Sequence, residues 1–384
     1  MENKKNQIFK IFLFILITTI LGCNINRGRN NSILKKDNPF QTLIDSVVVS
    51  NDSVAGIILH IESPDLNISW TGSAGADKVE SNANLKPNQP FRIASITKTY
   101  VATTILLLAE KDELSIDDSI GVYLSKEHLN ILKSDGYQTD KITIRNLLNH
   151  THGIFDYAMS DYYFKKIIEN PNHLWSRSEQ LEIAIQYGEP QGKPNEQFYY
   201  SDTGYILLGE IIESITGKSL AKSLRDLIGF ENLGFHSTWT ESIEPKPNGL
   251  QDIVHPYYNG IDFYAIDPSI DLYGGGGLVA TASDVAHFFQ TLFSNGIFKK
   301  HSTLETMLTK TNFSNGQQAT QDYRMGIQVA ETNGYKIYYH TGFWGTLAAY
   351  IPKLNSTVVM NFTYSYDPEI ILKSVSLLDK LKYN

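Results

Sequence analysis

The sequence contains a single cysteine among its 384 residues, Cys23. One cysteine cannot form an internal disulfide, and it excludes metal sites that are built from several cysteine thiolates. Basic residues are also in the minority, since 33 Lys and Arg stand against 41 Asp and Glu and give a formal net charge of −8. The sequence has no basic cluster of the kind that binds phosphate backbones, so nucleic acid is not an expected partner.

The apolar run near the start, from Ile11 to Leu21, is shorter than the roughly 20 residues that a membrane span needs. It follows a segment with three lysines and precedes Gly22 and Cys23, which is typical of a secretory signal over residues 1–22. The "ILGC" tetrapeptide resembles the lipobox of bacterial lipoproteins, and that resemblance implies a lipidated Cys23 and an exported protein of the bacterial cell envelope. A plain signal peptide with an incidental cysteine is the alternative.

The rest of the chain predicts a short tether and one folded domain. Residues 23–45 are polar and are expected to form a lipidated tether, and residues 46–384 are expected to fold. Strand patterns occupy 56–61, 66–72, 335–340, 345–352 and 356–363. These strands lie near both ends of the chain and bracket a mainly helical middle. The sequence therefore predicts an α+β fold with one antiparallel sheet (about 46–95 and 270–384), an inserted helical part (about 96–269) and a C-terminal helix.

The segment "FRIASITKTYVATTILLLAEKDEL", residues 91–114, reads as a helix that places Ser95 and Lys98 on one face, three residues apart. A Ser hydroxyl is a weak nucleophile and needs a base. Lys98 can be that base only if its pKa is lowered, or it can assist electrostatically. The helix N-terminus favours the negative charge of an acyl-transfer transition state. The alternative is a helix-capping Ser and a solvated Lys.

Two further motifs favour the catalytic interpretation. "YYSDTGYILLG" places Tyr200 and Asp202 before a helix, and "YYHTGFWGT" places His-Thr-Gly, residues 340–342, at the end of a strand. The order S-x-x-K, Y-S-D and H-T-G resembles the serine β-lactamase and penicillin-binding-protein superfamily, in particular the class C β-lactamase and D-alanyl-D-alanine carboxypeptidase branch. The likeness covers about residues 50–365 and implies a β-lactamase/transpeptidase-like fold with helices from both chain ends flanking the sheet.

The resemblance also implies a role for each motif residue. Ser95 matches the acylated nucleophile, Lys98 its partner, and Tyr200 the tyrosine that exchanges protons with the nucleophile and the leaving group. Its neighbour Tyr199 is expected to pack as core. Lys98 and a protonated His340 are expected to stabilise the Tyr200 phenolate.

The strand that carries the third motif is expected to complete the site. The backbone N–H groups of Ser95 and Phe343 are expected to form the oxyanion hole, and Thr341 and Gly342 to line the substrate.

The second and third motifs depart from the family pattern. Asp202 replaces the usual Asn, and because an ionised Asp only accepts hydrogen bonds, it can bind Lys98 but cannot donate to a substrate carbonyl. His340 replaces the Lys of most class C β-lactamases. A His with an ordinary pKa near 6.5 anchors a substrate carboxylate only while it is protonated, so we expect weak β-lactam turnover.

The sequence thus predicts an envelope serine hydrolase that works through an acyl-enzyme without cofactor or metal. The preferred substrates are D-alanyl-D-alanine-type peptides, hence peptidoglycan, with esters close behind; a class C-like β-lactamase and a non-catalytic penicillin or peptidoglycan sensor are the alternatives. The "HTH" pair His150 and His152 matches a structural turn of the family rather than a metal site. The glycines at 274–277 lack the ending of a phosphate loop and are expected to pack tightly beside the cleft.

Overall fold

A computed structural model describes residues 38–383, apart from 52–53, 80, 82, 314–320, 365–366 and 368. The predicted signal segment and Cys23 lie outside these residues. Within the described part of the chain, no helix has both the length and the apolar character needed to cross a membrane.

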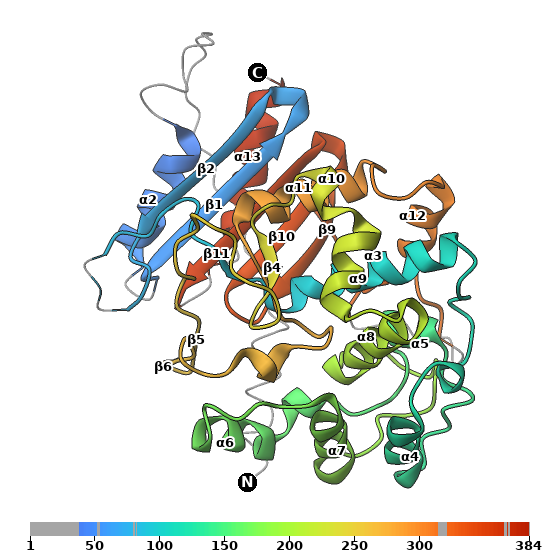
Figure 1. Cartoon of the computed structure of the whole chain (residues 1–384). Helices are drawn as coiled ribbons and strands as arrows, with labels where there is room; N and C mark the ends of the chain where they lie inside the picture. Colours follow the sequence, from blue (N-terminus) through green and yellow to red (C-terminus); the bar gives the residue numbers. More distant parts are fainter. Residues whose placement is uncertain are drawn as a thin grey trace.

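The centre of the fold is a six-stranded antiparallel sheet with the strand order β2-β1-β11-β10-β9-β8 (Figure 1). Its strands are β1 (Gly56–Ser63), β2 (Ile68–Gly75), β8 (Gln328–Thr332), β9 (Tyr335–Gly342), β10 (Thr346–Ile351) and β11 (Ser356–Thr363). The register joins the two chain ends directly, since Gly56 pairs with Thr363. The predicted sheet of strands from both ends is confirmed.

The two faces of this sheet bury different helices, as the alternation of side chains along a strand requires. Ile57, Leu59 and Ile61 of β1 pack in a core shared with α2 (Pro39–Ser50) and α13 (Glu369–Tyr383), whereas Ile58 faces the core that contains α11 (Ala282–Phe293). The expected flanking by helices from both ends of the chain is confirmed, and Figure 1 shows α2 and α13 on the side away from the helical part.

The expectation of a tether up to residue 45 is wrong from residue 39 onward. Asn38 caps α2 through its side-chain oxygen, which accepts a hydrogen bond from the backbone N–H of Phe40 at 2.9 Å. Phe40, Ile44 and Val47 are buried at helical spacing against the sheet. Their burial removes enough apolar surface from water to hold this polar-looking segment in the fold.

The remaining helices form the part of the molecule beyond the sheet (Figure 1). They are α3 (Thr97–Glu110), α4 (Lys126–Ser134), α5 (Ile144–Leu148), α6 (Asp161–Glu169), α7 (Arg177–Tyr187), α8 (Asp202–Thr216), α9 (Leu220–Ile228), α10 (Phe230–Leu233) and α12 (His301–Met307). Helix α8 begins at Asp202 and ends at Gly217, whose φ of 64° is a left-handed C-cap that glycine adopts without strain. The Tyr-Ser-Asp motif therefore lies at the start of α8.

Among the described residues, β8 at the edge of the large sheet and five shorter strands were not predicted. β3 (Phe91–Arg92), β7 (Leu278–Ala280) and β4 (Thr238–Thr240) form a small sheet in that order, and β5 (Tyr257–Tyr258) and β6 (Ile261–Asp262) form a hairpin. The interpretation of 91–114 as one helix is therefore wrong at both ends, since α3 ends at Glu110. Phe91 and Arg92 are strand, residues 94–96 form a 3₁₀ turn, and α3 begins at Thr97.

Candidate active site

Ser95 lies in the tight 3₁₀ turn between β3 and α3. The turn begins with Ala94, which is in the left-handed region with a φ of 47°. This conformation costs a residue with a Cβ roughly 1–2 kcal/mol, and such strain is concentrated at functional sites. Ile93, Ala94 and Ile96 are buried, but Ser95 remains partly exposed. The local fold thus presents one hydroxyl at the surface of an otherwise buried turn.

Lys98, one turn further along in α3, is completely buried. Its Nζ lies 2.9 Å from Ser95 Oγ, 2.6 Å from the Gly275 carbonyl oxygen and 2.6 Å from Asp202 Oδ1. An ammonium group has three N–H donors and no acceptor. Three oxygens therefore lie within reach of this ammonium group, and one of the three is the oxygen of the candidate nucleophile.

The electrostatics keep Lys98 protonated. Burial alone would lower its pKa, but the Asp202 carboxylate, followed by Tyr200 and Asp271, raises the pKa above its ordinary value. Of the two roles considered for Lys98, the structure therefore favours electrostatic assistance over proton abstraction. The expected contact between Asp202 and Lys98 is present.

Tyr200 approaches both residues from the segment before α8. Lys98 Nζ lies 5.1 Å from the centre of the Tyr200 ring. Burial raises the pKa of the Tyr200 phenol above its ordinary value, while Lys98 and a hydrogen bond with Ser95 act in the opposite direction. The net direction is upward, so the resting group is a phenol, while the effect of Lys98 on the pKa has the direction expected of a group that stabilises the phenolate. Tyr199 instead stacks on Phe155, with ring centres 6.4 Å apart.

His340 is neutral in the folded protein. It is 1% exposed, and burial together with Lys98 lowers its pKa to about 3. Nδ1 lies 2.7 Å from the Thr341 carbonyl oxygen and Nε2 lies 3.0 Å from the Tyr323 hydroxyl. Because a carbonyl only accepts, Nδ1 carries the proton and Nε2 accepts from Tyr323. The expected protonated His340, as phenolate stabiliser or carboxylate anchor, is wrong because both nitrogens are already used inside the protein.

The end of β9 lies against the Ser95 turn. A Cβ placed on Gly342 would come within 2.4 Å of the Ile93 carbonyl oxygen, and the Thr346 hydroxyl donates to the same oxygen at 3.2 Å. Only glycine permits this approach. Thr341 and Gly342 are partly exposed, and Phe343 is 46% exposed. The structure brings this strand end beside Ser95, while the oxyanion role of the Ser95 and Phe343 N–H groups stays a prediction.

The glycine loop before β7 packs as tightly as expected. A Cβ on Gly276 would lie 2.2 Å from Asp271 Oδ2, and the Gly275 carbonyl reaches Lys98. Burial, and after it the Asp202 charge, raises the pKa of Asp271 to about 7. Asp271 is a functional candidate that the motifs did not indicate.

His150 and Tyr323 are also site residues that the sequence interpretation missed. The His150 ring lies 4.2 Å from the Tyr200 ring and 4.6 Å from the Tyr323 ring. His150 Nδ1 accepts the Ser201 N–H at 3.2 Å, and burial lowers the pKa of His150 well below its usual range. A neutral His150 therefore supports the segment that carries Tyr200.

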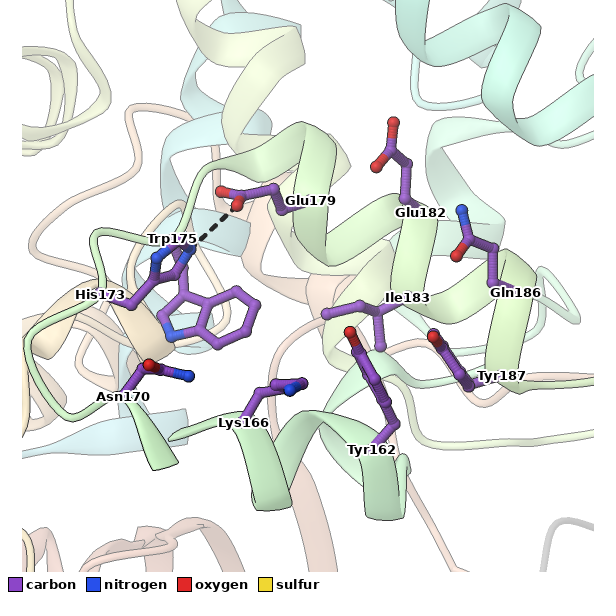
Figure 2. Close-up of a pocket in the computed structure, with 10 residues that line it drawn as sticks. All are labelled: Tyr162, Lys166, Asn170, His173, Trp175, Glu179, Glu182, Ile183, Gln186 and Tyr187. Carbon is purple, nitrogen blue, oxygen red and sulfur yellow. Dashed lines mark hydrogen bonds and ion pairs between the residues drawn. The ribbon is translucent and has the colours of Figure 1, made fainter. Parts of the chain in front are cut away.

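A cavity of about 270 Å³ lies elsewhere, between α6 and α7 (Figure 2). Tyr162 and Tyr187 form one wall, and Trp175 lies opposite with His173, which contacts Glu179 at 2.9 Å. None of its lining residues belongs to the three motifs. The candidate active site is therefore identified by the hydrogen bonds and charges around Ser95 and Lys98, and not by the size of a cavity.

Comparisons with known proteins agree with this geometry. The family model described as Beta-lactamase matches residues 64–373. Penicillin-binding protein 4* of Bacillus subtilis is 27% identical over 307 residues, which cover 75% of this chain and 63% of that protein. Among solved structures, a D-stereospecific amidohydrolase from Streptomyces sp. aligns with a TM-score of 0.74 at 23% identity, over 87% of this chain and 97% of that chain. A D-amino acid amidase from Ochrobactrum anthropi SV3 aligns with a TM-score of 0.71 at 21% identity, over 89% and 97%.

Proposed function

The chain belongs to the β-lactamase family of serine hydrolases, and we propose that it forms an acyl-enzyme at Ser95 and hydrolyses small neutral esters or amides. The observation that carries this proposal is the position of the buried Lys98 ammonium, which donates to Ser95 Oγ while Asp202 and Gly275 hold it in place. The Ser95 hydroxyl accepts a hydrogen bond from Lys98, so its own proton remains available for another partner. Tyr200 is that partner, since a hydrogen bond with Ser95 acts to lower the pKa of the Tyr200 phenol.

In the proposed reaction, Tyr200 acts as the proton carrier in its minor, ionised form. Lys98 stabilises that phenolate. The Ser95 proton passes to the phenolate as Oγ bonds to the substrate carbonyl carbon. The phenol then returns the proton to the leaving oxygen or nitrogen as its bond to that carbon breaks. In the second half, a water gives its proton to Tyr200 while its oxygen bonds to the acyl carbon. Tyr200 then reprotonates Ser95 Oγ as the bond between Oγ and that carbon breaks and the acid leaves.

The charges around Ser95 favour neutral substrates. Lys98 is already matched by Asp202, and His340 is neutral with both nitrogens engaged. A substrate carboxylate would therefore find no unpaired positive charge there to offset the free energy of removing it from water. An ester or amide carbonyl needs only the nucleophile and the oxyanion donors.

A second candidate is the hydrolysis of D-alanyl-D-alanine-type peptides of peptidoglycan. The relative named penicillin-binding protein 4* favours it, although this chain spans only 63% of that relative's length. The partly exposed Thr341 gives a hydroxyl that can bind a peptide carboxylate without a cation. A non-catalytic sensor would be acylated at the same Ser95, with one leaving group expelled, but would not release the acyl group.

A comparison of three substrates tests the proposal. p-Nitrophenyl acetate, a D-Ala-D-Ala dipeptide and benzylpenicillin would be offered to the wild type and to Ser95→Ala. We expect the highest kcat/KM for the ester, more than one equivalent of product per protein, and no turnover by Ser95→Ala. Faster turnover of the dipeptide would replace the first candidate by the second, and a single equivalent of product would indicate a sensor.

We also propose that Cys23 carries lipid and anchors the enzyme to the bacterial cell envelope. The "ILGC" sequence and the absence of any other cysteine support this proposal. Two or more acyl chains make membrane anchoring stable, whereas one is marginal. Expressed in bacteria, the wild type should enter the detergent phase on phase separation and Cys23→Ser should not; equal partitioning would remove the claim.

A further inference from the structure

Four aromatic side chains form a ring of contacts next to the Ser95 turn, and Phe164 of α6 packs against two of them, Tyr258 at 5.2 Å and Phe263 at 6.3 Å. Tyr258 contacts Phe343 with ring centres 4.7 Å apart, and Phe343 contacts Trp344 at 4.8 Å. Trp344 contacts Phe263 at 5.1 Å, and Phe263 contacts Tyr258 at 6.4 Å. We call this set, Tyr258, Phe263, Phe343 and Trp344, the aromatic wall. It joins the β5–β6 hairpin to the turn between β9 and β10.

The backbone fixes this wall relative to the nucleophile. Phe343 directly follows Gly342, whose backbone lies against Ile93. On the other side, Arg92 of β3 donates to the Phe263 carbonyl at 3.0 Å, and its guanidinium is held by Glu241 at 2.7 and 3.1 Å. Both ends of the wall are therefore attached to the strand and turn that carry Ser95.

The hairpin that holds Tyr258 is itself well defined. Asn259 and Gly260 have φ angles of 50° and 81°, the pair of left-handed residues that a two-residue hairpin turn requires. In Figure 1 the β5–β6 hairpin lies beside the end of the large sheet. Tyr258 thus approaches Phe343 from a short and constrained element.

Some rings of the aromatic wall are buried, and one presents an exposed face. Phe263 and Trp344 are 2% and 6% exposed, whereas Phe343 is 46% exposed. Packing within the protein therefore accounts for the two buried rings but leaves half of Phe343 in water. None of the four side chains carries a positive charge, so the face offers an aromatic ring or another apolar group a partner and offers a carboxylate none.

We propose that the Phe343 face, supported by Tyr258, binds an aromatic group of the substrate and makes the enzyme selective for esters or amides that carry one. This inference rests on the proposed function, since it places the aromatic group on a substrate that is acylating Ser95. The ring can belong to the acyl side or to the leaving-group side of the scissile bond. Both sources present the same ring to the same face.

Three ethyl and benzyl esters separate these two sources. Ethyl phenylacetate compared with ethyl acetate tests the acyl side, and benzyl acetate compared with ethyl acetate tests the leaving-group side, with acid release followed by pH-stat. Aromatic contacts of this kind correspond to about a 2- to 10-fold effect. In at least one comparison, the wild type should prefer the aromatic ester, and Phe343→Ala and Tyr258→Ala should each lower that kcat/KM ratio by about this factor.

The matched control is Tyr187→Ala, which removes an equally exposed tyrosine (46%) from the cavity between α6 and α7. It should leave both ratios at the wild-type value. Unchanged kcat/KM ratios in Phe343→Ala and Tyr258→Ala would contradict the binding of an aromatic group at the aromatic wall while leaving the proposed function intact. No acid release from any of the three esters by the wild type would instead overturn the proposed function, and the wall with it.

Discussion

Replacement of His340 by Gln tests whether the site contains a neutral or a charged histidine. The pKa of His340 is about 3 in the folded chain because of burial and Lys98, against about 6.5 in an unfolded chain. At pH 5 the folded protein therefore keeps this ring neutral, while the unfolded chain binds a proton. Folding opposes protonation, so the stability contributed by the neutral ring is present above pH 6.5 and is lost as the pH falls toward 3.

Proton linkage gives the size of this effect. With these two pKa values, the His340 contribution to the free energy of unfolding decreases by about 2 kcal/mol between pH 7.5 and pH 5. His340→Gln removes the titrating group, and its amide oxygen can still accept from the Tyr323 hydroxyl. The wild type should therefore lose about 2 kcal/mol more stability than the variant over this interval.

Urea denaturation at pH 7.5, 6 and 5, followed by tryptophan fluorescence, measures the difference. His301→Gln is the control, since the His301 side chain is 68% exposed and should give the wild-type pH dependence. His152, which also has its pKa lowered to about 3 by burial, is present in all three proteins and cancels. If His340→Gln retained the full wild-type pH dependence, the neutral buried His340 would be refuted and a charged substrate anchor would again be tenable.

Three further predictions concern the proton carrier and its surroundings. Tyr200→Phe should lower kcat by at least about 100-fold, as expected for a general acid–base group, and Tyr199→Phe should lower it much less; the reverse order would identify the wrong tyrosine. Because the pKa of Tyr200 is raised above its ordinary value, the fraction of phenolate increases about tenfold per pH unit at neutral pH. The kcat/KM for a neutral ester should therefore rise about tenfold per pH unit from pH 7 to 9. A plateau below pH 8 would contradict a phenolate base. Asp202→Asn keeps an acceptor for Lys98 but removes the charge that raises the pKa of Tyr200. The kcat/KM at pH 7.5 should therefore increase about tenfold. Lower activity at every pH would show that the carboxylate itself is required.

The three motifs were sufficient to predict which residues meet. Ser95 and Lys98 are one helical turn apart, and the other two motifs lie at the start of α8 and the end of β9, which both come close to the Ser95 turn. The large sheet was equally predictable, because β1 and β11 alternate between two apolar faces.

The ionisation of the site was not predictable from the motifs. The neutral state of His340 depends on burial that only the folded protein shows and on the nearby Lys98, and its Nε2 accepts from Tyr323, which lies 17 residues earlier in the chain. The raised pKa of Lys98 depends on how close Asp202 comes, and spacing along the sequence does not give that distance.

Short or polar elements were missed for a different reason. A two-residue strand such as β3 has too few residues for a periodic pattern, and α2 carries its apolar residues among polar ones. Both are held by tertiary contacts more than by local preference. The aromatic wall was missed in the same way, since its members come from segments 80 residues apart.

The most direct test of the central claim is the intact mass of the protein after brief exposure to p-nitrophenyl acetate at low pH, where deacylation is slow. We expect one added acetyl group, located in the peptide that contains Ser95, in the wild type and in Tyr187→Ala. Ser95→Ala should carry none. A stoichiometric adduct that persists in Ser95→Ala, or one that maps to another residue, would contradict the assignment of Ser95 as the nucleophile.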